Sequence, residues 1–216
     1  EPGSSIKPFV VAAALASGRY GPDSTIDTAP GFMTVGGYQI RDVHPIGSAT
    51  LTTVLEKSSN VGMAKLALDL PREMVWKTLQ GFGFGEVSAS GFPGESAGLL
   101  THYTHWRPVG IASLSRGYGL SVTPLQLARA YAVLGSGGIA RPITFLRQED
   151  LTPGLTPVTD RQTGRVIDEQ VARTLIRMLE AVVTREGTGK RAALTGYRVA
   201  GKTGTAWKAV AGGYSR

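Results

Sequence analysis

The sequence predicts a mostly helical α/β domain, and three observations lead to that expectation. Apolar residues recur at helical spacing in the segments 8–17, 124–134 and 168–184. Residues of high β propensity flank the pair Gly36-Gly37, which favours a hairpin. Strand-like residues then occupy 198–207. Because the helices at 8–17 and 168–184 have apolar faces, we expect a sheet that covers them.

Length and composition fit a globular chain whose partner carries negative charge. The 216 residues are enough for one or two domains, and 42% of them are apolar against 18% charged. The net charge of +7 and the pI near 9.9 favour nucleic acid, a membrane surface or an acidic polymer. The charges are scattered, however, so nothing marks a nucleic-acid-binding arm. The absence of cysteine excludes disulfides, thiolate metal sites and cysteine nucleophiles.

The first eighteen residues place a serine and a lysine at the start of a buried helix. Phe9–Ala16 is apolar on all sides, and Pro8 suits a first helical turn, where a missing N–H costs little. Ser4 and Lys7 are three residues apart, so they share one helix face. A lysine whose pKa is lowered by desolvation can remove the proton of a serine hydroxyl. Ser5 has Pro8 at the same spacing, so we expect Ser4 to be the nucleophile.

After the predicted hairpin, the chain reads as a series of short helices. Thr50 precedes a helical pattern that is interrupted at 57–60 and resumes as far as Pro71. Another helix is expected at 74–82, where glycines close it. The apolar run after Lys7 mimics a signal peptide, but it is too short to span a bilayer, which takes about 20 apolar residues.

The second half of the chain predicts two capped helices and a strand. Thr123 is an N-cap followed by proline, and Asp168 caps a long helix with one apolar face. A helix is also expected at 106–114. We expect a short strand at 141–147 and a loop at 151–164.

Several polar side chains have ordinary structural explanations. We expect Ser59 to pack or to cap a helix, and Asp42 and Glu56 to be solvated or salt-bridged. His102 and His105 are three residues apart, but no third ligand is near in the sequence, so no metal site is expected.

Three short motifs occur together in one order. Ser-x-x-Lys alone arises by chance roughly 0.5 times in this composition. The single asparagine, Asn60, follows Ser58 by two residues, a match with a chance expectation of about 0.07. Lys202-Thr203-Gly204 has a chance expectation of about 0.09. The chance expectation for all three motifs in this order is on the order of 10⁻³ or below, so coincidence is a poor explanation.

The three motifs in this order are the signature of the penicillin-recognising serine enzymes. The flanking residues resemble the transpeptidase domain of class B penicillin-binding proteins, with the septal cell-division type of Gram-negative bacteria as the nearest match. The segments that carry the resemblance are Glu1–Phe9, Lys57–Gly62, Gly117–Pro124 and Gly201–Ala206. The similarity extends over essentially all 216 residues.

The resemblance implies a penicillin-binding/β-lactamase-like serine transpeptidase fold, in which a β-sheet flanked by helices adjoins an all-helical lobe. It also implies a single-pass anchor in the bacterial inner membrane, a pedestal domain and a catalytic domain in the periplasm. The anchor, the pedestal and several of the family's strands and its closing helix have no counterpart in 1–216. We therefore expect a partial transpeptidase domain, mostly helical, that is poorly soluble and weakly active alone.

The resemblance also assigns catalytic roles residue by residue. Ser4 would be the acylated nucleophile and Lys7 its base. Ser58 would relay a proton to the leaving amine, and Asn60 would hold the amide backbone of the substrate. Lys202 would supply positive charge and order the proton network.

The substrate-binding roles follow from the same resemblance. Thr203 and Thr205 would bind the terminal carboxylate of the donor peptide, with Gly204 between them in the substrate site. The backbone N–H groups of Ser4 and Thr205 would form the oxyanion hole. Tyr118 would be part of the cleft wall.

The implied function is a serine-type D-alanyl-D-alanine transpeptidase that cross-links peptidoglycan stem peptides in septal wall synthesis and is inhibited by β-lactams. Septal division and glycosyltransferase membrane proteins would bind through segments outside 1–216. No nucleic acid, metal or organic cofactor is implied. Two residues depart from the family pattern: Arg116, where an aromatic residue is usual, and Trp207, where close relatives often have a basic one.

Other interpretations stay open at this point. Residues 196–203 match the Walker A pattern, which would make the chain a P-loop NTPase, but a P-loop needs a strand before and a helix after the motif. A serine β-lactamase shares the three motifs but needs a glutamate for deacylation, and no such motif is evident between Asn60 and Lys202. A non-catalytic β-lactam sensor would keep Ser4 and Lys7. An incomplete, inactive fragment is the remaining alternative.

Overall fold

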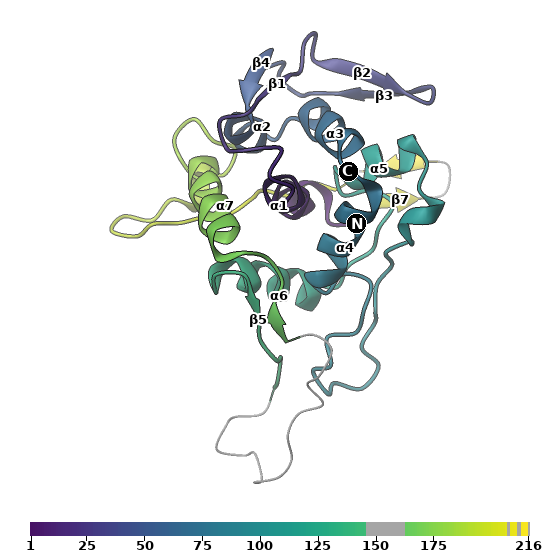
Figure 1. The fold of residues 1–216 in the computed structure, drawn as a ribbon, viewed down its shortest axis with the longest axis vertical. Helices are drawn as coiled ribbons and strands as arrows, with labels where there is room; N and C mark the ends of the chain where they lie inside the picture. Colours follow the sequence, from purple (N-terminus) through teal and green to yellow (C-terminus); the bar gives the residue numbers. More distant parts are fainter. Residues whose placement is uncertain (146–162, 207, 211–212, 216) are drawn as a thin grey trace.

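Helix α1 (Lys7–Ala16) lies at the centre of the molecule, and the other helices surround it (Figure 1). The structure, a computed structural model, describes residues 1–145, 163–206, 208–210 and 213–215. The helices packed most extensively on α1 are α3 (Asn60–Asp69), α4 (Arg72–Gly81) and α7 (Glu169–Val182). The remaining helical segments are η1 (Gly3–Ile6), α2 (Leu51–Glu56), η2 (Tyr103–His105), α5 (Pro108–Leu114), α6 (Pro124–Gly135) and η4 (Lys190–Ala192).

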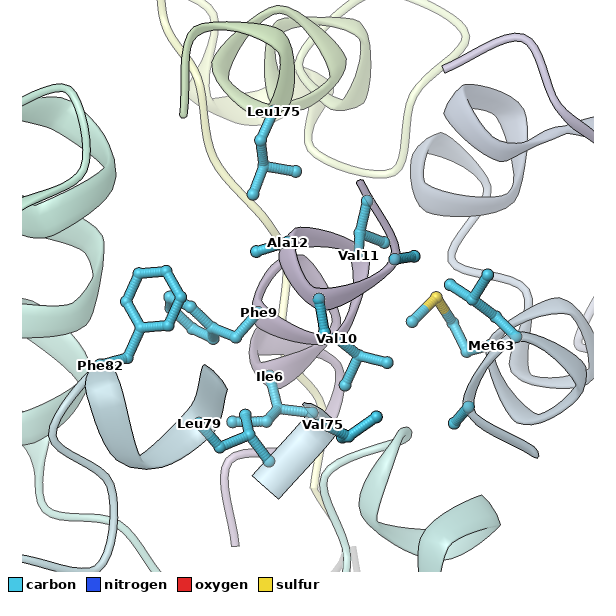
Figure 2. Close-up of a cluster of buried hydrophobic side chains, with 14 of the residues drawn as sticks. Ile6, Phe9, Val10, Val11, Ala12, Met63, Val75, Leu79, Phe82 and Leu175 are labelled. Atoms are coloured by element: carbon cyan, nitrogen blue, oxygen red, sulfur yellow. The ribbon is translucent and has the colours of Figure 1, made fainter. Parts of the chain in front are cut away.

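The central position of α1 follows from its sequence. The 3₁₀ turn η1 leads directly into the helix, and Pro8 occupies the first turn without losing a helical hydrogen bond. Every side chain from Lys7 to Ala14 is buried, so the helix has no solvent-facing stripe. Figure 2 shows its side chains radiating toward neighbours on different helices, among them Met63 of α3, Leu79 of α4 and Leu175 of α7.

An aromatic cluster fixes the face of α1 that points toward α4 and α6. The ring of Phe9 makes edge-to-face contacts with Phe82, Phe84 and Tyr131, at centroid distances of 4.8, 5.1 and 5.2 Å. The hydroxyl of Tyr131 donates a hydrogen bond to the carbonyl oxygen of Ser5 at 3.0 Å. The cluster therefore joins the helical core to the turn that carries the predicted nucleophile.

The predicted helix starts after Thr50, Thr123 and Asp168 are confirmed, whereas the helices expected at 74–82 and 106–114 begin at Arg72 and Pro108. The hydroxyls of Thr50, Ser59 and Thr123 accept hydrogen bonds from backbone N–H groups of α2, α3 and α6, and the Asp168 carboxylate does the same for α7. At α6 the side chain of Gln126 completes a capping box. These local signals locate the starts of the four capped helices correctly, because an N-cap acts within one turn of the chain.

The described strands form four two-stranded antiparallel sheets rather than one large sheet. Strands β2 (Phe32–Val35) and β3 (Tyr38–Arg41) form the predicted hairpin around Gly36-Gly37. The other pairs are β1 (Thr25–Asp27) with β4 (Ser48–Thr50), β5 (Ile139–Ala140) with β6 (Gly164–Arg165), and β7 (Lys208–Val210) with β8 (Gly213–Ser215).

The prediction of a strand at 198–207 is wrong for the described part of that segment. Residues 198–206 have no regular secondary structure, and residue 207 lies outside the described residues. A strand needs a neighbouring strand to satisfy its backbone groups, and among the described strands β7 and β8 pair only with each other. The predicted strand at 141–147 is also not observed at 141–145. Residues 146–147, and nearly all of the predicted 151–164 loop, lie outside the described residues.

None of the helices in the described ranges combines the length and apolar character needed to cross a bilayer.

We expect Phe9→Ala to lower the free energy of unfolding by about 3–5 kcal/mol, because it removes the ring that three other aromatics contact and leaves a cavity. Chemical denaturation followed by circular dichroism measures this loss. The matched control is Phe92→Ala, since Phe92 is 64% exposed and its loss should cost less than about 1 kcal/mol. Equal losses in the two variants would contradict the central role of the α1 cluster.

Candidate active site

A cavity of about 810 Å³ opens beside the N-terminal end of α1. Its walls come from η1, the segment between β3 and β4, the α2–α3 junction, the segment after α5, and the chain after α7. The lining residues are Ser4, Asp42, Val43, His44, Lys57, Ser58, Ser59, Asn60, Arg116, Tyr118, Thr188, Thr203 and Thr205. Parts of the chain far apart in sequence therefore converge on the turn that carries Ser4.

Lys7 lies beneath this cavity and joins α1 to the α2–α3 junction. Its side chain is fully buried. The Nζ atom lies 2.7 Å from the carbonyl oxygen of Ser58, 3.0 Å from the Ser58 hydroxyl and 2.9 Å from Oδ1 of Asn60. These contacts are short enough to be hydrogen bonds, and they bring the first two predicted motifs together.

The surroundings of Lys7 lower the pKa of its amine well below the ordinary lysine value. Burial is the largest cause, because it disfavours the charged form. The positive charges of Lys202 and Arg116 lower this pKa further, whereas the negative charge of Asp42 raises it. The balance favours a neutral amine at a lower pH than for a lysine in water, which is the state a general base requires.

Counting protons shows how a neutral Lys7 fits its three partners. A neutral amine has two N–H groups and one lone pair. The carbonyl oxygens of Ser58 and Asn60 can only accept, so they take the two N–H groups. The lone pair is then left for a hydroxyl, and the Ser58 hydroxyl at 3.0 Å can donate to it. The site can thus pass a proton between an amine and a serine.

The backbone at Ser58 has the geometry that makes both of its contacts possible. Ser58 has φ of 58°, a left-handed conformation that non-glycine residues rarely adopt. It lies between the end of α2 and the N-cap of α3, where the chain reverses. In this conformation the carbonyl and the hydroxyl of one residue both point to Lys7. Such a conformation costs energy and occurs mostly where the site depends on it.

Asp42 organises the start of α3, contrary to the expectation that it is solvated or salt-bridged. Its Oδ1 accepts hydrogen bonds from the backbone N–H groups of Asn60 and Val61, and its Oδ2 accepts one from the Ser59 hydroxyl at 2.7 Å. A carboxylate at a helix N-terminus is favoured by the exposed N–H groups and the helix dipole. The prediction that Ser59 caps a helix is confirmed, since its hydroxyl accepts from the Gly62 N–H at 2.9 Å.

The turn that carries Ser4 lies between two other segments. The backbone N–H of Gly3 donates to the carbonyl oxygen of Gly117 at 3.2 Å, and Gly117 has φ of 88°. A Cβ at position 117 would overlap the backbone of Gly3, so only glycine permits this approach. On the other side, a Cβ at position 3 would overlap the backbone of Thr205, and Gly204 lies against Pro2 and Ser5.

Lys202 contributes positive charge to this region. Its Nζ donates to the carbonyl oxygen and the hydroxyl of Thr203, at 3.1 and 3.2 Å. Burial lowers the pKa of Lys202 to about 8. The Thr203 hydroxyl in turn forms a hydrogen bond with the Thr188 hydroxyl at 3.2 Å, which links the Lys202 segment to the residues just after the end of α7. Below pH about 8 the segment therefore carries a cation near two cavity-lining threonines, Thr203 and Thr205.

The structure brings together all the site residues predicted from the sequence. Ser4, Ser58, Asn60, Tyr118, Thr203 and Thr205 line the cavity, Gly204 lies against the Ser4 turn, and Lys7 and Lys202 act on the cavity through their bonds and charges. No hydrogen bond joins the hydroxyl of Ser4 to Lys7 within the described residues. Catalytic hydrogen bonds are often long without a ligand, so this spacing does not argue against the pair.

The P-loop interpretation of the sequence finds no support in the geometry. Residues 196–206 form turns and irregular chain, with neither the strand before nor the helix after that a P-loop needs. Within the described ranges, no three metal-ligating side chains gather at one point.

The Ser-x-x-Lys, Ser-x-Asn and Lys-Thr-Gly motifs, which the structure brings to one cavity, match the signature of the penicillin-recognising serine enzymes. The chain belongs to one family in that class: the model for the penicillin-binding protein transpeptidase domain matches residues 1–216. The resemblance inferred from the motifs is thereby confirmed.

Individual relatives agree with this assignment. The chain is 43% identical over 208 residues to peptidoglycan D,D-transpeptidase FtsI of Escherichia coli. The aligned part is 96% of this chain and 34% of that protein. It is 41% identical over 215 residues to a probable peptidoglycan D,D-transpeptidase, PbpC, of Pseudomonas aeruginosa, covering 100% of the chain and 36% of that protein. The chain thus spans about a third of the length of these curated relatives.

A solved structure confirms the predicted fold class. The transpeptidase domain of penicillin-binding protein 3 from Burkholderia pseudomallei superimposes with a TM-score of 0.90 at 40% identity, covering 100% of this chain and 63% of that one. The fold is therefore the α/β fold of penicillin-binding transpeptidase domains.

We expect Asp42→Ala to slow acylation by a β-lactam at least tenfold and to lower the free energy of unfolding by about 1–3 kcal/mol, because three donors at the start of α3 lose their acceptor. Stopped-flow acylation and thermal melting measure the two effects. Asp23→Ala is the matched control, since it removes an exposed acid. Acylation of the Asp42→Ala variant at the wild-type rate would show that Asp42 does not position the α2–α3 junction.

Proposed function

We propose that this chain is the catalytic part of a peptidoglycan D,D-transpeptidase that works through an acyl-serine intermediate. The observation that carries the proposal is the buried Lys7 amine, bonded to Ser58 and Asn60, one helical turn from Ser4 at the edge of an 810 Å³ cavity. The names of the relatives support the same reaction class, because several are peptidoglycan D,D-transpeptidases.

Acylation begins with the hydroxyl of Ser4. The oxygen attacks the carbonyl carbon of the penultimate D-alanine of a donor stem peptide, and the neutral amine of Lys7 takes the proton. The negative charge on the carbonyl oxygen is stabilised by the backbone N–H groups of Ser4 and Thr205. The terminal carboxylate of the donor binds Thr203 and Thr205, where Lys202 adds positive charge.

The leaving amine then needs a proton, and the Ser58 hydroxyl can deliver it. Ser58 lies 3.0 Å from Lys7 Nζ, so the proton taken from Ser4 passes from Lys7 through Ser58 to the amine of the departing D-alanine. In the second half of the reaction an amine of a neighbouring stem attacks the ester. Ser58 and Lys7 then pass a proton from that attacking amine to the Ser4 oxygen, which leaves as a hydroxyl, and a new amide bond links the two stems.

Deacylation by water is the point on which a β-lactamase differs. Such an enzyme needs a carboxylate that activates water beside the ester. Asp42 is the only acid among the described residues that line the cavity, and its two oxygens are held by the start of α3. This arrangement favours a long-lived acyl-enzyme, and hence inhibition by β-lactams, over rapid hydrolysis.

The cellular setting is proposed from the resemblance to the septal cell-division type of class B penicillin-binding proteins. That resemblance implies a role in septal cell-wall synthesis and a catalytic domain in the periplasm of a membrane-anchored protein. Division and glycosyltransferase membrane proteins would be its partners through other parts of the parent protein.

Mass spectrometry after incubation with benzylpenicillin is the experiment that tests this function. We expect one covalent adduct per chain, on the peptide that contains Ser4, because Lys7 lies one turn from that residue. Lys7→Arg is the matched control: it keeps a positive charge but cannot act as a base, so its adduct should form at under about 10% of the wild-type rate. An adduct on Ser5 or Ser58, or none in the wild type, would contradict the assignment.

The acylation rate should have a bell-shaped pH dependence. It falls at low pH as Lys7 becomes protonated, and it falls above pH about 8 as Lys202 loses its charge. In Lys202→Gln the maximal rate should fall and the alkaline limb should disappear. The acid limb should move to higher pH, because the charge that lowers the pKa of Lys7 is gone.

Rates of benzylpenicillin acylation from pH 5 to 10 measure both limbs. The control is Lys190→Gln, which removes a positive charge from an exposed position. An acid limb that does not move in Lys202→Gln would show that Lys202 does not influence Lys7.

A further inference from the structure

Arg116 stands out in the cavity wall because it is a half-buried cation that the reaction sequence above does not use. Its Nε donates to the carbonyl oxygen of Ala112 at 3.2 Å, and one Nη lies 3.5 Å from the Ser113 hydroxyl. The guanidinium lies over the ring of Tyr118, 5.6 Å from its centroid. These contacts hold the side chain in one orientation while engaging only part of its five N–H donors.

The charge of Arg116 has no acidic partner within the described residues. The ion pairs of the cavity region belong instead to Lys57, which pairs with Glu56 at 3.2 Å and with Glu186 at 3.9 Å. Asp42 lines the same cavity, but its oxygens are held by α3. Burial also lowers the pKa of Arg116, which reflects the cost of partial desolvation. A desolvated cation with unused donors is a favourable place for an anion.

The backbone places Arg116 close to the reacting serine. Its neighbour Gly117 lies directly against Gly3, the residue before Ser4. The positive charge of Arg116 also contributes to lowering the pKa of Lys7, so the two side chains are within electrostatic range. Arg116 approaches the Ser4 turn from the segment after α5, whereas Thr203 and Thr205 approach it from the chain after α7. The cavity thus has two separate groups of polar side chains, Arg116 on one side and Thr203 and Thr205 on the other.

We propose that Arg116 is a specificity-determining residue that binds a second carboxylate, carried on the acyl side of the donor in addition to its terminal carboxylate. This inference rests on the proposed function, since it concerns the donor that acylates Ser4. The planar guanidinium can bind a carboxylate through two parallel N–H···O bonds. The donor class is therefore a stem peptide, or a β-lactam, with an anionic group on the part that stays attached to the serine.

A pair of penicillins separates this role from a general effect on Lys7. Carbenicillin differs from benzylpenicillin by one carboxylate on the acyl side chain. A change in the pKa of Lys7 alters both acylation rates alike, so it cancels in their ratio. Binding of the second carboxylate changes only the carbenicillin rate, and the ratio of the two rate constants therefore measures recognition by Arg116.

The experiment compares the second-order acylation rate constants for the two penicillins in the wild type, Arg116→Gln, Arg116→Lys and Arg107→Gln. We expect the carbenicillin-to-benzylpenicillin ratio to fall about tenfold in Arg116→Gln. It should be intermediate in Arg116→Lys, which keeps the charge without the planar fork. Arg107→Gln removes an exposed arginine outside the cavity lining and should leave the ratio unchanged.

The salt dependence of the wild type gives a second measurement that needs no variant to fold. Raising the sodium chloride concentration from about 50 to about 500 mM should slow acylation by carbenicillin more than acylation by benzylpenicillin, because salt screens the ion pair between Arg116 and the second carboxylate. An unchanged ratio in Arg116→Gln, or equal salt dependence of the two penicillins, would overturn the inference while leaving the proposed function intact. Failure of both penicillins to acylate the wild type would instead overturn the proposed function and the inference with it.

Discussion

The burial of the Lys7 amine is the interaction on which the rest of the site depends. A charged ammonium in a fully buried position would be costly, so the fold surrounds it with oxygen acceptors and with other cations. The oxygen acceptors replace hydrogen bonds to the lost water, and the neighbouring cations favour the neutral form of the amine. Together they convert an ordinary lysine into a group that can accept a proton at moderate pH.

The architecture follows from keeping those acceptors in place. Helix α1 is apolar on all sides and holds Lys7 at its start, while the aromatic cluster around Phe9 fixes the helix in the core. The acceptors come from the α2–α3 junction, whose reversal requires the left-handed backbone of Ser58. Asp42 then holds the start of α3. The contacts that stabilise the core therefore also hold the hydrogen-bond acceptors of Lys7 in place.

The sequence was sufficient to predict the parts of the site that depend on short spacings. Ser4 and Lys7 are one turn apart, Ser58 and Asn60 lie in one reversal, and the helix caps act within a turn, so local patterns identify them. Asp42 was interpreted wrongly because its partners lie 17 to 19 residues away, and no local signal marks a carboxylate that caps a distant helix. The sequence marks Arg116 as a departure, but whether an acidic partner lies near it among the described residues depends on which segments meet in the cavity.

The wrong prediction of a strand at 198–207 also has a non-local cause. Its residues have the β propensity of a strand, but a strand forms only where another strand pairs with it, and pairing is a property of the whole fold. Within the described chain, residues 201–206 instead form irregular backbone, and residues 204–206 lie against the Ser4 turn, with Gly204 against Pro2 and Ser5. The motif was therefore located correctly, although its secondary structure was not.

Direct titration of the Lys7 amine tests the central claim. Protein labelled with ¹³C at lysine Cε gives one NMR signal per lysine, and the Lys7 signal is assigned by its loss in Lys7→Met. We predict that this signal titrates well below the ordinary lysine pKa of about 10.4. Titration at or above the ordinary value would contradict the account, because Lys7 would then be charged where the mechanism requires a base.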